Sequence, residues 1–211
     1  KYIASKTIKQ MIAADCKIKG GNVLILGLTF KENCEDFEFT EYFVEPSYVQ
    51  KVGQVGAVHG SGQFTVGRSY VSLKDSSPNK VPVYAPTDMV LTWGSYYGNP
   101  AAISESLPDY ALRFDAGCDV EITYTHLKEV VGPIAQQLPE VKPDSRQSQL
   151  DPVEFKAGDL VGYVIQKNAC VSGFDFMVHD ANVVNQFANQ ERYETRSSNI
   201  LNAVCPYDLY K

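Results

Sequence analysis

The sequence predicts a mainly β fold, namely a β-barrel or sandwich with long loop insertions. Closely spaced short strands with turn signals are typical of such folds. The segment DAGCDV lies between two strand-like runs, and its Gly117 can take a positive φ, so a hairpin is predicted there. The 211 residues, 44% of them hydrophobic, are enough to bury a core. Beyond about Phe37 the β-prone runs are GQFTVGRSYVSL, VPVYAP, MVLTW, YALRF, DVEITYTHL, VEFKAGDLVGYVI and FDFMV.

Two segments interrupt the β pattern and are expected to be surface excursions. One is GNPAAISESLPD, and the other is PIAQQLPEVKPDSRQSQLDP, rich in Pro, Gln and Ser. A short helix is expected at Lys128–Leu138, just before or within the second excursion. From about Asn182 the chain is Asn-rich and weakly periodic, so we expect a tail that wraps the barrel or frays.

The first 36 residues follow a different pattern. Apolar and small residues recur at helical spacing in KYIASKTIKQMIAADCKIKGG, and Gly20 with Gly21 supplies a stop signal. The next run, NVLILGLTF, has the length and composition of a strand buried on both faces. We therefore expect a helix-strand α/β fragment over residues 1–36 and a β domain over residues 40–211, with its tail from about residue 182.

Charge and hydropathy exclude two classes of partner. The 25 acidic and 19 basic residues give a net charge of -6, which argues against a nucleic-acid binder that neutralises phosphates. The longest apolar runs fall well short of the roughly 20 residues of a membrane-spanning helix. No signal peptide follows Lys1, and because Lys1 is not a methionine we expect the natural N-terminus to precede it. The compartment stays open.

The five cysteines form no CxxC pair, so neither a zinc ribbon nor a thioredoxin-like redox site is indicated. We expect buried free thiols. A bridge between Cys170 and Cys205, tying the tail to the barrel, is the alternative.

The string VLILGLTFKENCED is similar to the C-terminal domain of nucleotide-sugar dehydrogenases, which oxidise UDP-sugars with NAD. The resemblance implies substrate-binding roles for Lys31 and Asn33. The GxGxxG turn and the cysteine nucleophile motif that this chemistry needs do not occur here. The segment is therefore interpreted as a fragment of such a domain, with a chance match of an ordinary helix and strand as the alternative.

The order of VPVYAPTDMVLTWGSYYG, YTHLKEVV and FKAGDLVGYV resembles the barrel of lysostaphin-type (LytM-type) zinc peptidases. In that family the histidine of the YTHL-like motif faces the active-site groove, so the resemblance implies that position for His126, with Tyr124 beside it. Gly158 and Asp159 match the turn that precedes the last barrel strands.

The zinc ligands of that family are largely missing. Its chemistry needs two histidines and an aspartate around an open coordination position. RSYVSLKDSSPNK, where the first pair is expected, contains no histidine, and Asp175 and Met177 occupy the places of the two later histidines. A thioether is a poor substitute for imidazole on zinc. We expect no cofactor.

An alternative site could use His126, Asp175 and His179, with His59 as a further metal ligand and zinc as the metal. Each histidine also has a simpler interpretation. His59 lies between glycine-rich turns, His179 would cap a strand end, and His126 would be a hydrogen-bonded groove residue.

Aromatic residues could line a groove for a sugar or peptide ligand. The candidates are Trp93, Tyr96 and Tyr97, together with Tyr124. Packing inside the barrel is the alternative role for these rings.

Together these patterns predict a non-catalytic, degenerate lysostaphin-like barrel that acts as a binding or scaffold module for a cell-wall glycan or peptide. Two alternatives remain open. One is a zinc peptidase with a rearranged site, and the other is a fragment or fusion of an NAD-dependent UDP-sugar dehydrogenase of polysaccharide biosynthesis.

Overall fold

The computed structural model describes residues 37–57, 66–97, 109–138, 146–166, 173–187, 190–194 and 198–211. The chain divides into two compact units, residues 1–32 and residues 33–211. The helix and strand expected in residues 1–36 lie outside the described residues, and so do Lys31, Asn33 and His59. No helix within the described part of the chain is long and apolar enough to cross a membrane.

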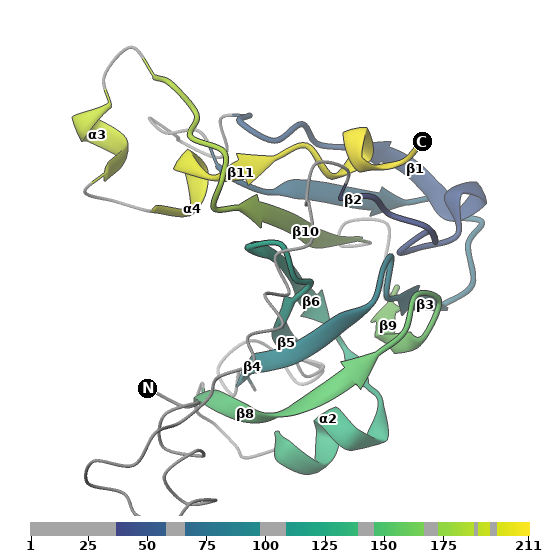
Figure 1. Ribbon diagram of the computed structural model, residues 1–211. Coiled ribbons are helices and arrows are strands. Elements are labelled where there is room, and N and C mark those ends of the chain that lie inside the picture. Colours follow the sequence, from purple (N-terminus) through teal and green to yellow (C-terminus); the bar gives the residue numbers. More distant parts are fainter. Residues whose placement is uncertain are drawn as a thin grey trace, which may run out of the picture. The chain divides into compact units, whose positions relative to one another are not determined.

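Short strands dominate the second unit, so the prediction of a mainly β fold is confirmed (Figure 1). The elements are η1 (Pro46–Tyr48), β1 (Val49–Val52), β2 (Ser69–Leu73), β3 (Lys80–Tyr84), β4 (Met89–Tyr97), β5 (Asp109–Asp115), β6 (Val120–Leu127), β7 (Glu129–Val130), α2 (Gly132–Gln137), β8 (Arg146–Phe155), β9 (Leu160–Ile165), β10 (Gly173–Asp180), α3 (Glu191–Glu194), α4 (Ser198–Leu201), β11 (Ala203–Val204) and η2 (Pro206–Leu209).

The larger sheet follows the order β1-β2-β10-β6-β5-β4-β8 among the described strands, with β11 joined to β10 off this path. Its strand pairs are antiparallel. β10 pairs with β2 through Gly173–Phe176 and with β11 through Val178 and His179. Two segments that are far apart in the sequence therefore share one edge of β10. Figure 1 shows the yellow β11 lying beside β10.

A smaller antiparallel sheet has the order β3-β9-β7. The two sheets are linked by Tyr124, whose hydroxyl donates to the carbonyl oxygen of Tyr84 over 2.8 Å. Gly162 in β9 lets β7 approach closely, because a Cβ there would lie 2.4 Å from the carbonyl oxygen of Glu129. Any side chain at position 162 would therefore push β7 away from β9.

The core lies on the face of the larger sheet that turns toward Tyr84 and the smaller sheet. Phe174, Phe176 and Val178 alternate along β10 and are fully buried. The ring of Phe176 stacks on Phe43 with centroids 4.0 Å apart and meets the ring of Tyr124 at 4.9 Å. Aromatic packing of this kind adds to the burial of apolar area and fixes the relative positions of the strands.

The hairpin expected at DAGCDV forms between β5 and β6, where Gly117 has a φ of 78°. Gly158 likewise takes a φ of 86° in the turn before β9. The short helix expected at Lys128–Leu138 is present as α2, which is shorter at its start because Glu129 and Val130 pair with β9 as β7.

One expectation about an irregular segment is wrong, and another is narrowed to one of its two alternatives. Residues 146–152, assigned to a loop, are the first part of β8, because they pair with β4 along the sheet edge. The tail after Asn182 contains β11 and η2, and Phe39 donates its backbone N–H to the carbonyl oxygen of Leu209. The described part of the tail therefore packs on the β unit, which is the wrapping alternative, and does not fray.

The cysteines agree with the expectation of free thiols at one described position and differ from it at another. Cys205 is a free, half-buried thiol, so the bridge to Cys170 does not form. Cys118 is disulfide-bonded, which corrects the expectation of a free thiol at that position.

Candidate functional site

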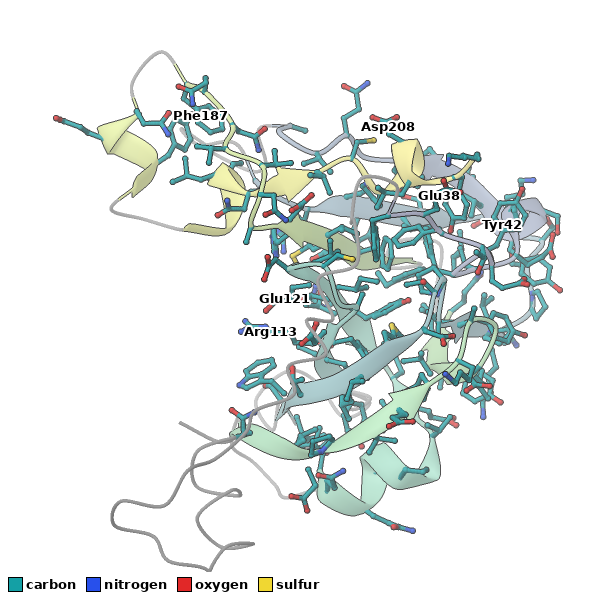
Figure 2. The ribbon with its side chains drawn as sticks, in the orientation of Figure 1. Glu38, Tyr42, Arg113, Glu121, Phe187 and Asp208 are labelled. Atoms are coloured by element: carbon teal, nitrogen blue, oxygen red, sulfur yellow. The ribbon has the colours of Figure 1, made fainter. Side chains whose placement is uncertain are left out.

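The face of the larger sheet opposite the core carries a group of charged side chains. Because strand residues alternate between faces, Asp175, Met177 and His179 point away from the core that Phe174 and Phe176 enter. We call this side the polar face. Figure 2 shows two of its residues, Arg113 and Glu121, next to each other on the side of the sheet away from β3 and β9.

Asp175 is the most deeply buried charge of the polar face, with a side chain only 2% exposed. Its Oδ2 atom accepts a hydrogen bond from Arg68 Nη1 at 2.7 Å and another from Thr125 Oγ1 at 3.2 Å. His126 Nε2 lies 3.4 Å from the same oxygen. Burial alone would raise the pKa of Asp175, but the bond from His126 and the charge of Arg68 hold that pKa below its usual value.

His126 connects two carboxylates. Its Nδ1 lies 3.0 Å from Asp109 Oδ2, while its Nε2 faces Asp175. The hydrogen bond to Asp109, followed by the bond to Asp175, raises the pKa of His126 from 6.5 to about 9. The imidazole is therefore protonated at neutral pH, and both of its N–H groups are occupied.

The backbone of His126 is also unusual, with a φ of 66°. Residues other than Gly rarely adopt this left-handed conformation, although Asn, Asp and His do so more often than the rest. The ladder between β5 and β6 shifts register nearby, between Tyr110 and Leu112. This irregularity turns the His126 ring toward Asp109, which also lies 3.5 Å from Lys128 Nζ.

A second group lies further along the same face. The guanidinium of Arg113 lies over the ring of Trp93, with Cζ 5.0 Å from the ring centroid. Arg113 Nε is 3.2 Å from Glu121 Oε1, an ion-pair contact without hydrogen-bond geometry. His179 Nδ1 lies 3.6 Å from the same Glu121 oxygen, and His179 is only 8% exposed.

The residues considered as zinc ligands on the polar face do not converge on one point. The described residues contain no group of three or more His, Cys, Asp or Glu side chains placed to bind a metal ion. Asp175 and His179 lie four residues apart on β10, roughly 13 Å along the strand, which is too far for one ion. His126 and Asp175 do meet, as a salt bridge, and the other ring nitrogen of His126 faces Asp109.

The aromatic candidates separate into two kinds. Trp93 lies on the polar face against Arg113, as a ligand-facing role would require. Tyr96 and Tyr124 are 2% and 0% exposed, so the groove role expected for them is wrong and they belong to the core. Tyr97 is a residue of β4 whose side chain is not described.

Sequence reasoning missed several residues that build the site, namely Arg68, Asp109, Arg113, Glu121, Thr125 and Lys128. Asp109 was assigned to the end of a loop, and no motif surrounds Arg68. The one signal available was the alternation along FDFMVHD, which places Asp175 on the opposite face of the strand from Phe174 and Phe176.

An apolar cleft of about 330 Å³ opens elsewhere, beside η1 and β1. None of the described residues that line it carries a carboxylate, ammonium, guanidinium or imidazole group. Its lining residues are Tyr42, Phe43, Val44, Pro46, Val49, Val52, Val71, Tyr207 and Tyr210.

No family model matches the chain. Two curated proteins share a short stretch with it. Protein CapL of Staphylococcus aureus is 49% identical over 41 residues, which is 19% of this chain and 10% of CapL. The UDP-N-acetyl-D-glucosamine 6-dehydrogenase of Salmonella typhi is 49% identical over 39 residues, 18% of this chain and 9% of that enzyme. The chain thus spans about a tenth of the length of these relatives.

Among solved structures, a zinc containing peptidase from Vibrio cholerae is similar at 15% identity and a TM-score of 0.40. The similarity covers 67% of this chain and 36% of the peptidase.

Proposed function

We propose that the β unit is a non-hydrolytic binding module whose ligand surface is the polar face around His126. The ligand class that we propose is a cell-wall glycan or peptide. One observation carries the non-hydrolytic part, namely that carboxylates engage both ring nitrogens of His126 and raise its pKa to about 9. A metal ligand or a general base needs a free nitrogen lone pair, and a protonated imidazole has none.

Asp175 supports the same proposal from the other side of the salt bridge. Its Oδ2 faces Arg68, Thr125 and His126, so a metal that bound through this oxygen would compete with these contacts. Met177, on the same face of β10, adds a neutral thioether that zinc rarely selects. The chemistry of these residues fits a preorganised salt-bridge network better than a metal centre.

The exposed parts of this network supply a surface for recognition. The side chains of Arg68 and His126 are 40% and 44% exposed, whereas Asp175 beneath them is buried. The buried carboxylate of Asp175 therefore holds exposed cationic groups in fixed positions, which lowers the conformational entropy that a ligand must remove on binding.

The test combines two measurements on the full chain. Zinc content by mass spectrometry and release of peptide from purified peptidoglycan should both be null, while the protein should sediment with the insoluble wall material. The variant His126→Asn suits this experiment, because Asn tolerates a positive φ but cannot form the charged bridge.

We expect His126→Asn to weaken sedimentation with the wall material. Lys80→Gln serves as the matched control, since it removes an exposed cation paired with Glu129 on the smaller sheet. Stoichiometric zinc together with peptidoglycan cleavage would overturn the proposal, and so would equal sedimentation of both variants and the parent protein.

A second proposal concerns the stretch of about 40 residues that is 49% identical to two longer proteins. We propose that it is a fragment of a nucleotide-sugar dehydrogenase domain that has no oxidising activity in this chain. The absence of a GxGxxG turn and of the nucleophile motif supports this proposal. NADH formed from a UDP-sugar and NAD by the purified chain would contradict it.

A further inference from the structure

The polar face carries a row of side chains that runs across the strands. In the ladders, Met177 faces Thr123, Thr123 faces Arg113, and Arg113 faces Trp93. Arg68 extends the row, because it precedes Ser69, which pairs with Phe176, and so lies level with Met177. The row therefore presents one arginine on each side of Thr123 and Met177.

We propose that this row binds an acidic glycan, with Arg68 and Arg113 each pairing with a carboxylate on a different sugar. The inference rests on the proposed binding function and names its ligand class. It goes beyond the network around His126, since it includes the separate group formed by Trp93, Arg113 and Glu121.

Both arginines keep donors available for a ligand. A guanidinium has five N–H groups, and Arg68 donates to Asp175 through Nη1. Arg113 approaches Glu121 through Nε, and its two terminal nitrogens are not part of that contact. Both side chains are 40% exposed, and each is held in place by a carboxylate on a neighbouring strand. Planar, fixed guanidinium groups are suited to bidentate recognition of carboxylates.

The spacing of the arginines predicts an extended ligand. Three strand-to-strand steps separate Arg68 from Arg113, which corresponds to roughly 14 Å between their backbones. One carboxylate cannot bridge that distance. A chain of sugars with repeated acid groups could reach both arginines while passing over Met177 and Thr123.

The sheet geometry favours a glycan over an acidic peptide. Peptides that bind to sheets usually add a strand at a free edge, where main-chain groups are available. The strands under this row, β10, β6, β5 and β4, are each paired on both sides, so they offer no main-chain groups. Side-chain donors and the ring of Trp93 remain, and these suit sugar carboxylates and ring faces.

The experiment uses the full chain and oligogalacturonate as the acidic glycan, with binding measured by calorimetry. The methyl-esterified form of the same oligosaccharide is the matched ligand, because it keeps the sugars and removes the charge. Poly-glutamate tests the peptide alternative. Lys156→Gln is the matched protein control, since Lys156 is an exposed cation paired with Asp88 in a turn away from the row.

We expect oligogalacturonate to bind, with affinity falling as salt increases, and the methyl ester to bind at least about tenfold more weakly. Arg113→Gln should lose roughly tenfold in affinity, Arg113→Lys should lose less, and Lys156→Gln should match the parent protein. A smaller loss of affinity in Arg113→Lys than in Arg113→Gln would show that the charge contacts the ligand, because a folding defect would not depend on the charge at position 113.

Equal binding of the methyl ester, tighter binding of poly-glutamate, or an unchanged affinity for Arg113→Gln would overturn the proposal. The wall-sedimentation assay separates this failure from failure of the binding function. If His126→Asn loses sedimentation while Arg113→Gln binds normally, the binding function stands and the acidic-glycan row does not.

Discussion

β10 carries very different side chains on its two faces. Toward the core, Phe174, Phe176 and Val178 are fully buried among aromatic rings. On the opposite face, Asp175 is 2% exposed as well, but it is surrounded by cations and a hydroxyl. The core face is stabilised by non-directional burial, whereas the polar face depends on partners in defined positions and protonation states. We therefore expect side chains that are equally buried on the two faces of β10 to respond differently to mutation and to pH.

Removal of a core ring should have the largest effect. Phe176→Ala deletes a side chain that contacts Phe43 and Tyr124, and the packed sheets cannot close around the cavity. We expect a loss of about 4 kcal/mol in the free energy of unfolding. Urea denaturation followed by tryptophan fluorescence measures it. Val184→Ala, at a position 58% exposed, is the control and should change stability little; similar losses for both variants would contradict the assignment of the core face.

Neutralising the buried charge should rank second. Asp175→Asn keeps the size of the side chain but leaves Arg68 and His126 without their anion. We expect a loss of about 3 kcal/mol at neutral pH. The pKa of Asp175 is held low, so its stabilisation is present above the pKa of an unfolded aspartate and is lost as pH falls through the folded value.

The same variant gives a spectroscopic readout. In Asp175→Asn the pKa of His126 should fall below about 9, because one of its two carboxylate partners is gone. Proton NMR titration of the imidazole measures that pKa directly. An unchanged His126 pKa would show that Asp175 does not act on the histidine.

A smaller effect should follow pH on the alkaline side. His126 has a pKa of about 9 in the fold against 6.5 for the ordinary group, so its stabilisation is complete below pH 6.5 and is lost as pH rises through about 9. Because the ring is 44% exposed, screening reduces this stabilisation to about 1–2 kcal/mol. Thermal unfolding from neutral to alkaline pH should show the loss in the parent protein and not in His126→Asn; parallel curves would contradict the prediction.

The smallest effect should come from a surface pair that belongs to neither face. Lys156 and Asp88 form an ion pair at 2.7 Å, with side chains 72% and 61% exposed. The hydrogen bond from Lys156, with a backbone bond from Ala157, lowers the pKa of Asp88, but solvent screens the pair. The melting temperature of Lys156→Gln should therefore match that of the parent protein. A clear decrease would mean that exposed charges matter as much as buried ones here.

Much of the core face could be predicted from the sequence, because strand alternation and turn glycines are local signals. The runs around β5, β6 and β10 and the turns at Gly117 and Gly158 were predicted on this basis. The start of β8 was missed because its Gln- and Ser-rich sequence has weak strand propensity and is fixed by pairing with β4. Such pairing is a tertiary property.

The polar face was less predictable because its contacts join distant parts of the sequence. Arg68 and Asp175 are 107 residues apart, and only the pairing of β2 with β10 brings them together. His126 and Asp109 are 17 residues apart and meet through the irregular β5–β6 ladder. His126 was identified from a resemblance, but its position between two carboxylates required the structure.

The shared edge of β10 has a consequence for synthesis on the ribosome. β2 occupies one part of that edge and β11, near residue 203, occupies the rest, while Phe39 pairs with Leu209 and Tyr210. A nascent chain in which β11 is still in the exit tunnel therefore holds β10 with part of its edge open, which is a template for non-native strand pairing. The interval between the emergence of β10 and that of β11 is the period in which a chaperone would protect this protein most.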